Sequence, residues 1–124
     1  MELTSDGSSM VVLARGTCAS RGRAMGRARV MREEAELAMV QDGEVAVLRC
    51  AWPEAGATLG RVAAVVAERG GVLCSLGTLA REAGVPCIVA AAGATEAVSD
   101  GEIVVVDADA GVVAVLGEVV ALPI

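Results

Sequence analysis

The fold of this chain is decided by residues 70–86, which read GGVLCSLGTLAREAGVP. An apolar, β-branched run at residues 63–67 precedes this stretch and predicts a strand that ends where the glycine pair permits a tight turn. Beyond the turn, apolar residues recur at helical spacing, Ser75 is a favoured N-cap residue, and Gly84 followed by Pro86 ends the helix. The stretch therefore predicts a strand, a glycine loop and a helix N-terminus in succession.

This succession of elements suits the binding of an anion. The free backbone N–H groups of the first helical turn, and the positive end of the helix dipole, point toward whatever Cys74 and Ser75 hold. We therefore take Cys74 and Ser75 as the candidate catalytic residues. The candidates for holding an anionic ligand are Gly70, Gly71, Thr78 and Arg81.

The composition bounds the class of protein. The chain has 124 residues, which fits one domain, and 55% of them are hydrophobic although only one is aromatic. A core built from Val, Ala, Leu and Ile favours strands backed by Ala-rich helices, so we expect an α/β fold. Residues 1–9 are polar and are expected to be disordered, which leaves residues 10–124 as a single domain.

The charge and the hydropathy exclude several settings. A net charge of −6 argues against nucleic acid as a partner. No run reaches the ~20 apolar residues that a membrane span needs, so no membrane partner is expected. The N-terminus has neither the basic region nor the apolar core of a signal peptide, which predicts a cytoplasmic protein. No cofactor is predicted.

The clustered arginines and the four cysteines each allow a functional and a structural interpretation. Five of the ten basic residues lie between Arg21 and Arg32; this cluster could hold an anion, but we favour a solvated strand face. The cysteines form no Cys-x-x-Cys pair, and no histidine could complete a zinc site, so no metal is predicted. Three of the four cysteines are expected to be buried free thiols. The four are Cys18, Cys50, Cys74 and Cys87.

Further elements are predicted on both sides of the central stretch. Small residues alternate with arginines within residues 16–30, as in a half-exposed strand. A short helical link is predicted over residues 33–39, and a second helix starts with Pro53 in its first turn. Trp52 is expected to be a partly buried packing residue. Apolar runs of strand length lie at residues 10–14, 45–48, 87–91, 103–107 and 112–116.

Residues 70–86 also contain the pattern Gly-Gly, eight residues, Ala-Arg-Glu, three residues, Pro. Together with an opening glycine motif from Gly16 and a closing Asp-Gly and valine motif before Leu116, this pattern covers nearly the whole chain. In these landmarks the chain resembles the phosphohistidine swivelling domain. This is the mobile domain of phosphoenolpyruvate-utilising enzymes such as pyruvate phosphate dikinase, phosphoenolpyruvate synthase and rifampicin phosphotransferase.

The resemblance implies a three-layer β/β/α swivelling domain, and it also implies a change at the reacting position. Ser75 stands where that family has its phosphoryl-accepting histidine, Cys74 where it has serine or threonine, and Gly77 where it has alanine. The chain contains no histidine, so the family's phosphohistidine mechanism is closed to it. Catalysis by that mechanism is therefore not expected.

Several functions are compatible with these residues. We favour a stand-alone binding or scaffold subunit that docks onto a separately encoded nucleotide-binding or substrate-binding protein; a homo-oligomer is left open. The alternative is one component of a split phosphotransferase that uses Cys74 as a phosphoryl or acyl carrier, because a thiolate is strongly nucleophilic whereas a serine phosphate is too stable to be a relay. A third hypothesis is that a phosphorylated or carboxylated ligand binds at the helix N-terminus. A further one is that the glycine loop, with Ser75 or Arg81, forms part of a composite active site that uses no phosphoryl intermediate. Non-functional roles remain beside these: Ser75 as a plain N-cap and Cys74 as a small buried hydrophobe.

Overall fold

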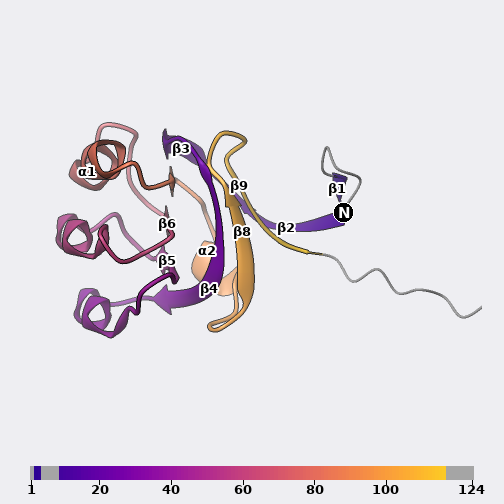
Figure 1. Ribbon diagram of the computed structural model, residues 1–124, viewed down its shortest axis with the longest axis horizontal. Coiled ribbons are helices and arrows are strands. Elements are labelled where there is room, and N and C mark those ends of the chain that lie inside the picture. Colours follow the sequence, from indigo (N-terminus) through magenta and orange to yellow (C-terminus); the bar gives the residue numbers. More distant parts are fainter. Residues whose placement is uncertain (1, 4–8, 117–124) are drawn as a thin grey trace, which may run out of the picture.

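The computed structural model describes residues 2–3 and 9–116, which form the expected α/β architecture in three layers (Figure 1). A layer of helices packs on a mainly parallel sheet, and an antiparallel sheet packs on the other face of that parallel sheet. The described strands are β1 (Glu2–Leu3), β2 (Ser9–Arg15), β3 (Thr17–Ser20), β4 (Arg23–Met31), β5 (Val45–Leu48), β6 (Ala64–Ala67), β7 (Cys87–Val89), β8 (Ile103–Asp107) and β9 (Val112–Leu116). The described helices are the 3₁₀ helices η1 (Glu34–Met39) and η2 (Pro53–Thr58) and the α-helices α1 (Ser75–Ala83) and α2 (Ala94–Ala97).

Strand β4 belongs to both sheets. Its first half, from Arg23 to Arg27, pairs antiparallel with β8, and its second half, from Ala28 to Met31, pairs parallel with β5. The described strands therefore follow one another in the order β1-β2-β9-β8-β4-β5-β6-β7-β3. Because β4, β5, β6 and β7 run parallel, their carboxyl ends lie along one edge. In open α/β sheets this is the edge where ligands bind.

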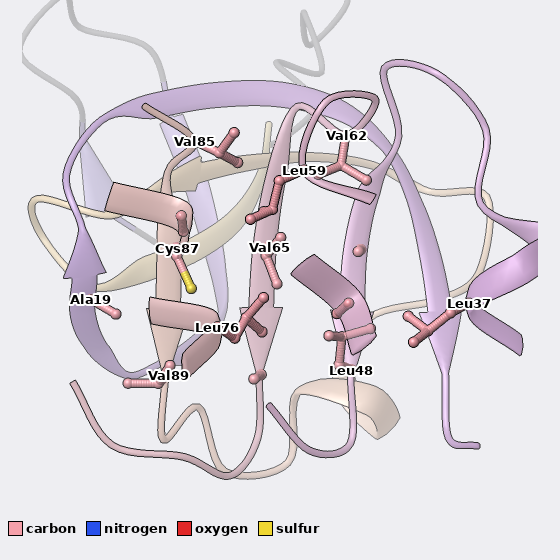
Figure 2. Packing of buried hydrophobic residues seen from close by; sticks show 14 of the residues in the cluster. Ala19, Leu37, Leu48, Leu59, Val62, Val65, Leu76, Val85, Cys87 and Val89 are labelled. Atoms are coloured by element: carbon pink, nitrogen blue, oxygen red, sulfur yellow. The ribbon is translucent and has the colours of Figure 1, made fainter. Parts of the chain in front are cut away.

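A first hydrophobic layer joins the helices to the parallel sheet. Leu37, Leu59 and Leu76 come from the helical layer, and they pack with Leu48 of β5 and Val65 of β6 (Figure 2). Full burial of one such side chain contributes about 1.5–3 kcal/mol to folding. The helix α1 that follows the glycine loop is therefore fixed to the sheet through Leu76, which has no exposed surface.

A second hydrophobic layer fills the space between the two sheets. Val47 of β5 and Val66 of β6 face Val104, Val106 and Val113 of the antiparallel sheet. Strands β5 and β6 are thus buried on both faces, and this explains why they read as continuous apolar runs without alternation.

Most of the predicted elements occupy their expected positions, with differences at the ends of the chain and in the helical links. Residues 33–39 and the segment after Trp52 form 3₁₀ helices, with Pro53 in the first turn of η2 as predicted. Within the N-terminal segment expected to be disordered, Glu2–Leu3 pairs with β2, while residues 1 and 4–8 lie outside the described residues. In the described part of the chain, no helix is long and apolar enough to cross a membrane.

The arginine cluster between Arg21 and Arg32 mainly follows one solvent-facing side of β4. Arg23 lies 3.0 Å from an Asp107 oxygen, and two guanidinium nitrogens of Arg29 donate to the Glu44 carboxylate at 3.2 and 3.1 Å. These ion pairs support the strand-face interpretation. Arg21 precedes β4, and Arg32 follows its carboxyl end.

Candidate glycine-loop site

The glycine loop connects the end of β6 to the start of α1 and passes close to the segment after β5. Gly70 has a φ of 129°, a conformation that side chains disfavour. A Cβ at this position would lie 2.7 Å from the Cβ of Ala51, so only glycine allows the two segments to approach. The loop then turns back through a hydrogen bond from the Cys74 N–H to the Gly71 carbonyl at 3.0 Å.

The N-cap role expected of Ser75 falls to Cys74. Cys74 has extended backbone angles and is the N-cap of α1; its Sγ accepts a hydrogen bond from the Gly77 N–H at 3.3 Å. The prediction that Ser75 is the N-cap is therefore wrong, since Ser75 is the first residue of the helix itself. Ser75 is exposed, whereas Cys74 is half-buried and packs against the hydrophobic core.

Arg81 and Thr78 were both predicted to hold an anion. The two side chains form a hydrogen bond with one another, and Arg81 also donates to backbone carbonyl groups. One terminal nitrogen of Arg81 donates to the carbonyls of Ala19 at 2.7 Å and Val72 at 2.9 Å, and the other donates to Thr78 Oγ1 at 3.1 Å. Arg81 thereby joins β3, the glycine loop and α1. This arrangement makes Arg81 a structural clamp of the loop, and its predicted role toward an anion stays a prediction.

Gly77 lets α1 pack closely under the loop. A Cβ on Gly77 would lie 2.9 Å from the Val72 carbonyl oxygen and 3.3 Å from the Ala19 Cβ. A methyl group here would press on the same carbonyl that Arg81 holds. The small residue and the arginine clamp therefore belong to one local packing arrangement.

Exposed apolar side chains lie on the glycine loop just before Ser75 and on the helix α1 that Ser75 begins. Leu73 is 88% exposed, and Val72 and Leu79 are each 39% exposed. We call these three residues the glycine-loop patch. Exposed large apolar side chains on a loop and on the helix that follows it are typical of a surface that meets another molecule.

The four cysteines are free thiols, but only one is buried. Cys18, Cys50 and Cys74 are half-buried, so the expectation of three buried thiols is wrong. Burial, together with the nearby thiols of Cys74 and Cys18, raises the pKa of Cys87 to about 12 despite the opposing effect of Arg81. Cys87 is accordingly an inert core residue. Among the described residues, no group of histidines, cysteines or carboxylates is arranged to hold a metal ion.

A second polar cluster, which the sequence analysis missed, lies at the carboxyl ends of the parallel strands. Arg32 follows β4, Arg49 follows β5, and Glu68 and Arg69 follow β6. Thr95 of α2 contacts this cluster through hydrogen bonds. Its signal in the sequence is a charged residue directly after β4, β5 and β6, although not after β7, and this signal becomes meaningful once the strands are known to be parallel.

Comparison with known proteins gives the family. The model of the family described as "PEP-utilising enzyme, mobile domain" matches residues 40–111. A probable phosphoenolpyruvate synthase of Methanothermobacter thermautotrophicus is 33% identical over 85% of this chain, and an uncharacterized phosphotransferase of Bacillus subtilis is 31% identical over 82%. The chain belongs to the mobile-domain family of PEP-utilising enzymes. It spans only 15% and 12% of the length of these two relatives.

Solved structures agree on the fold. The match to the solution structure of Enzyme I (nEIt) covers 65% of this chain and 33% of the Enzyme I chain, at 25% identity and a TM-score of 0.55. Thermococcus kodakaraensis aconitase X matches 84% of this chain and 98% of its own, at 16% identity and a TM-score of 0.62. The second likeness shows the fold alone.

Proposed function

We propose that this chain is a binding or scaffold subunit that docks, through the glycine-loop patch, onto a separately encoded nucleotide-binding or substrate-binding protein. The observation that carries this proposal is the exposure of Val72 and Leu73 on the glycine loop and of Leu79 on α1, the helix that begins at the exposed Ser75. Arg81 holds the Val72 carbonyl, so Val72 and Leu73 are presented on a fixed loop, and Leu79 belongs to the helix that follows it. A rigid, apolar projection loses little conformational entropy when it enters a pocket on a partner.

A role without covalent catalysis agrees with the residues of the loop. The chain has no histidine, and the hydroxyl of Ser75 would form a phosphate ester too stable to pass on. The Cys74 thiol, the alternative phosphoryl or acyl carrier, accepts the Gly77 N–H and packs against the core. These contacts give Cys74 a structural role and favour the docking function over the carrier function.

The proposal of a separate subunit is supported by the size of two solved structures with a similar fold. Aconitase X and a UPF0107 protein are matched over 98% and 100% of their own chains, so a domain of this fold can make up a whole chain. Cytoplasmic location is part of the same proposal.

Association of variants with the partner tests the proposal. The chain is purified from its source with the proteins that accompany it, and the nucleotide-binding or substrate-binding protein among them is used for affinity measurements. Leu73→Asp is expected to weaken this association at least about tenfold, because a charge would enter an apolar contact. Met25→Asp is the matched control, since Met25 is 59% exposed on β4 at the antiparallel sheet.

The outcomes separate the hypotheses. Equal affinity of wild type and Leu73→Asp, or equal loss in Leu73→Asp and Met25→Asp, would overturn docking through the patch. Cys74→Ala is expected to leave the turnover of the bound partner unchanged. A partner whose turnover stops with Cys74→Ala, together with a phosphoryl or acyl group on Cys74 in mass spectra, would establish the carrier function instead.

A further inference from the structure

The antiparallel sheet has an apolar outer face, on the side away from the parallel sheet. Val104 and Val106 of β8 belong to the core between the two sheets, so Ile103 and Val105, which alternate with them, lie on the outer face. Within the described residues, the hydrophobic cluster on this face comes from strands only, with no contribution from a helix. Its members are Met10, Val12, Val105, Val112 and Ala114.

Part of this face is hollowed and exposed to solvent. Met25 of β4 is 59% exposed, Ile103 of β8 is 48% exposed and Leu116 of β9 is 55% exposed. These three side chains gather around one hollow of about 310 Å³, whose other lining residues are Glu102, Val105 and Val115. Large apolar side chains that are exposed side by side are typical of a surface that another protein covers.

Two opposite charges flank the hollow at one end. Arg27 of β4 is the register partner of Ile103, and Glu102 directly precedes Ile103. In residues 2–3 and 9–116 neither charge takes part in an ion pair. Arg27 donates to the Gly101 carbonyl at 3.4 Å, and Glu102 Oε1 accepts the Ser99 N–H at 3.2 Å. Both charges can therefore pair with charges on a second molecule.

We propose that two copies of the chain meet at this face, sheet against sheet, around a two-fold axis. An axis that runs parallel to the strands, between β4 and β8, lays β4 of one copy over β8 of the other. Met25 then lies over Val105 of the second copy, because these two residues are register partners and share one level along the strands. For the same reason, Arg27 lies next to Glu102 of the second copy.

The charges favour a second copy over an unrelated protein. A two-fold interface requires a patch that is complementary to itself. Here the apolar centre meets an apolar centre, and both contacts between Arg27 and Glu102 join opposite charges, which fixes how the two sheets are oriented. No further residue type has to be assumed on the second molecule.

The size of the face indicates a weak dimer. Strands β2, β9, β8 and β4 lie side by side at a spacing of about 4.8 Å, so the face is roughly 15 Å wide. A contact of this width is at the low end of specific interfaces, and we expect a Kd of about 10–100 µM.

Analytical ultracentrifugation of the full chain from about 5 µM to about 1 mM tests the dimer, and wild type should change from monomer to dimer over this range. Met25→Asp is expected to raise the Kd at least about tenfold, because a charge would enter an apolar contact. Met39→Asp is the matched control and should dimerise like wild type. Met39 is 62% exposed, but it belongs to η1 in the helical layer.

Exchange of the flanking charges tests the two-fold arrangement. Arg27→Glu and Glu102→Arg each place like charges together at both contacts, so each variant alone should dimerise at least about tenfold more weakly than wild type. A mixture of the two variants should regain the association, because each copy then carries the charges that the other lacks. Mixing would not reverse a loss that came from misfolding.

Three results would overturn the inference. A full chain that stays monomeric at about 1 mM would leave the face to another occupant, either a different protein or residues 117–124. Equal weakening by Met25→Asp and Met39→Asp would place the contact elsewhere, and a mixture that does not associate would exclude the two-fold arrangement. None of these results bears on docking through the glycine-loop patch, because α1 and the antiparallel sheet lie on opposite sides of the parallel sheet (Figure 1).

Discussion

At the scale of single residues, Cys74 shows how a residue with reactive chemistry can serve the backbone. Its thiol caps α1 by accepting the Gly77 N–H. Removing an N-cap side chain typically destabilises a protein by ~1 kcal/mol. The same half-buried side chain also packs against the hydrophobic core, so both capping and packing contribute.

These two contributions can be separated by substitution. Cys74→Ala is expected to lower the free energy of unfolding by about 1 kcal/mol, whereas Cys74→Ser should stay within about 0.5 kcal/mol of wild type because its hydroxyl is a good cap. Urea unfolding at equilibrium measures both. An equal loss in the two variants would contradict this account and show that the thiol stabilises the helix start by packing.

The cap also explains why the start of α1 was predicted one residue too late. Serine is the stronger N-cap by local preference, and this preference selected Ser75. The turn closed by the Cys74 N–H and the Gly71 carbonyl makes Cys74 the last extended residue. Local propensity was thus overridden by the geometry of the loop, which residue type alone does not reveal.

At the scale of elements, the bond between Glu68 and Thr95 ties the end of β6 to α2. Partial burial acts to raise the pKa of Glu68, but the two hydrogen bonds from Thr95, with Arg49 and Arg69 nearby, outweigh it and lower the pKa below its usual 4.5. A lowered folded-state pKa stabilises the fold above the unfolded-state value. This stabilisation is lost as the pH falls through the folded-state pKa.

Stability measured against pH tests this link. Wild type should lose free energy of unfolding as the pH falls below about 4.5, and Glu68→Gln should lose less over the same range, since the glutamine does not titrate. Urea unfolding between about pH 6 and about pH 3 gives the comparison. Glu96→Gln, an exposed change on the same helix as Thr95, is the control. Parallel curves for wild type and Glu68→Gln would exclude the link as a source of acid sensitivity.

The elements differ in how well the sequence predicts them. β5 and β6 were predicted because strands buried on both faces must be apolar at every position. The polar cluster at the carboxyl ends of the parallel strands was not predicted, because Arg32, Arg49 and Glu68 become neighbours only through the parallel order of the strands. In the sequence, each of these residues indicates only that a strand ends there.

At the scale of the whole molecule, the two sheets meet at a glycine. Gly16 lies between β2 of the antiparallel sheet and β3 at the edge of the parallel sheet, and its N–H donates to the Gly111 carbonyl at 2.9 Å. A Cβ on Gly16 would lie 2.5 Å from the Val89 carbonyl oxygen and 2.6 Å from Ile88 Cγ2. The first of these is backbone and cannot rotate away, so the sheets would have to separate.

Gly16→Ala is therefore expected to destabilise the whole domain by roughly 2–4 kcal/mol, because it forces apart two layers that share one core. The matched control is Gly60→Ala: no atom lies within 4 Å of a Cβ there, so its change should stay within about 0.5 kcal/mol. Thermal and urea unfolding measure both variants. A Gly16→Ala variant as stable as Gly60→Ala would mean that the sheets can shift relative to each other at this junction, and that close contact through Gly16 does not hold the layers together.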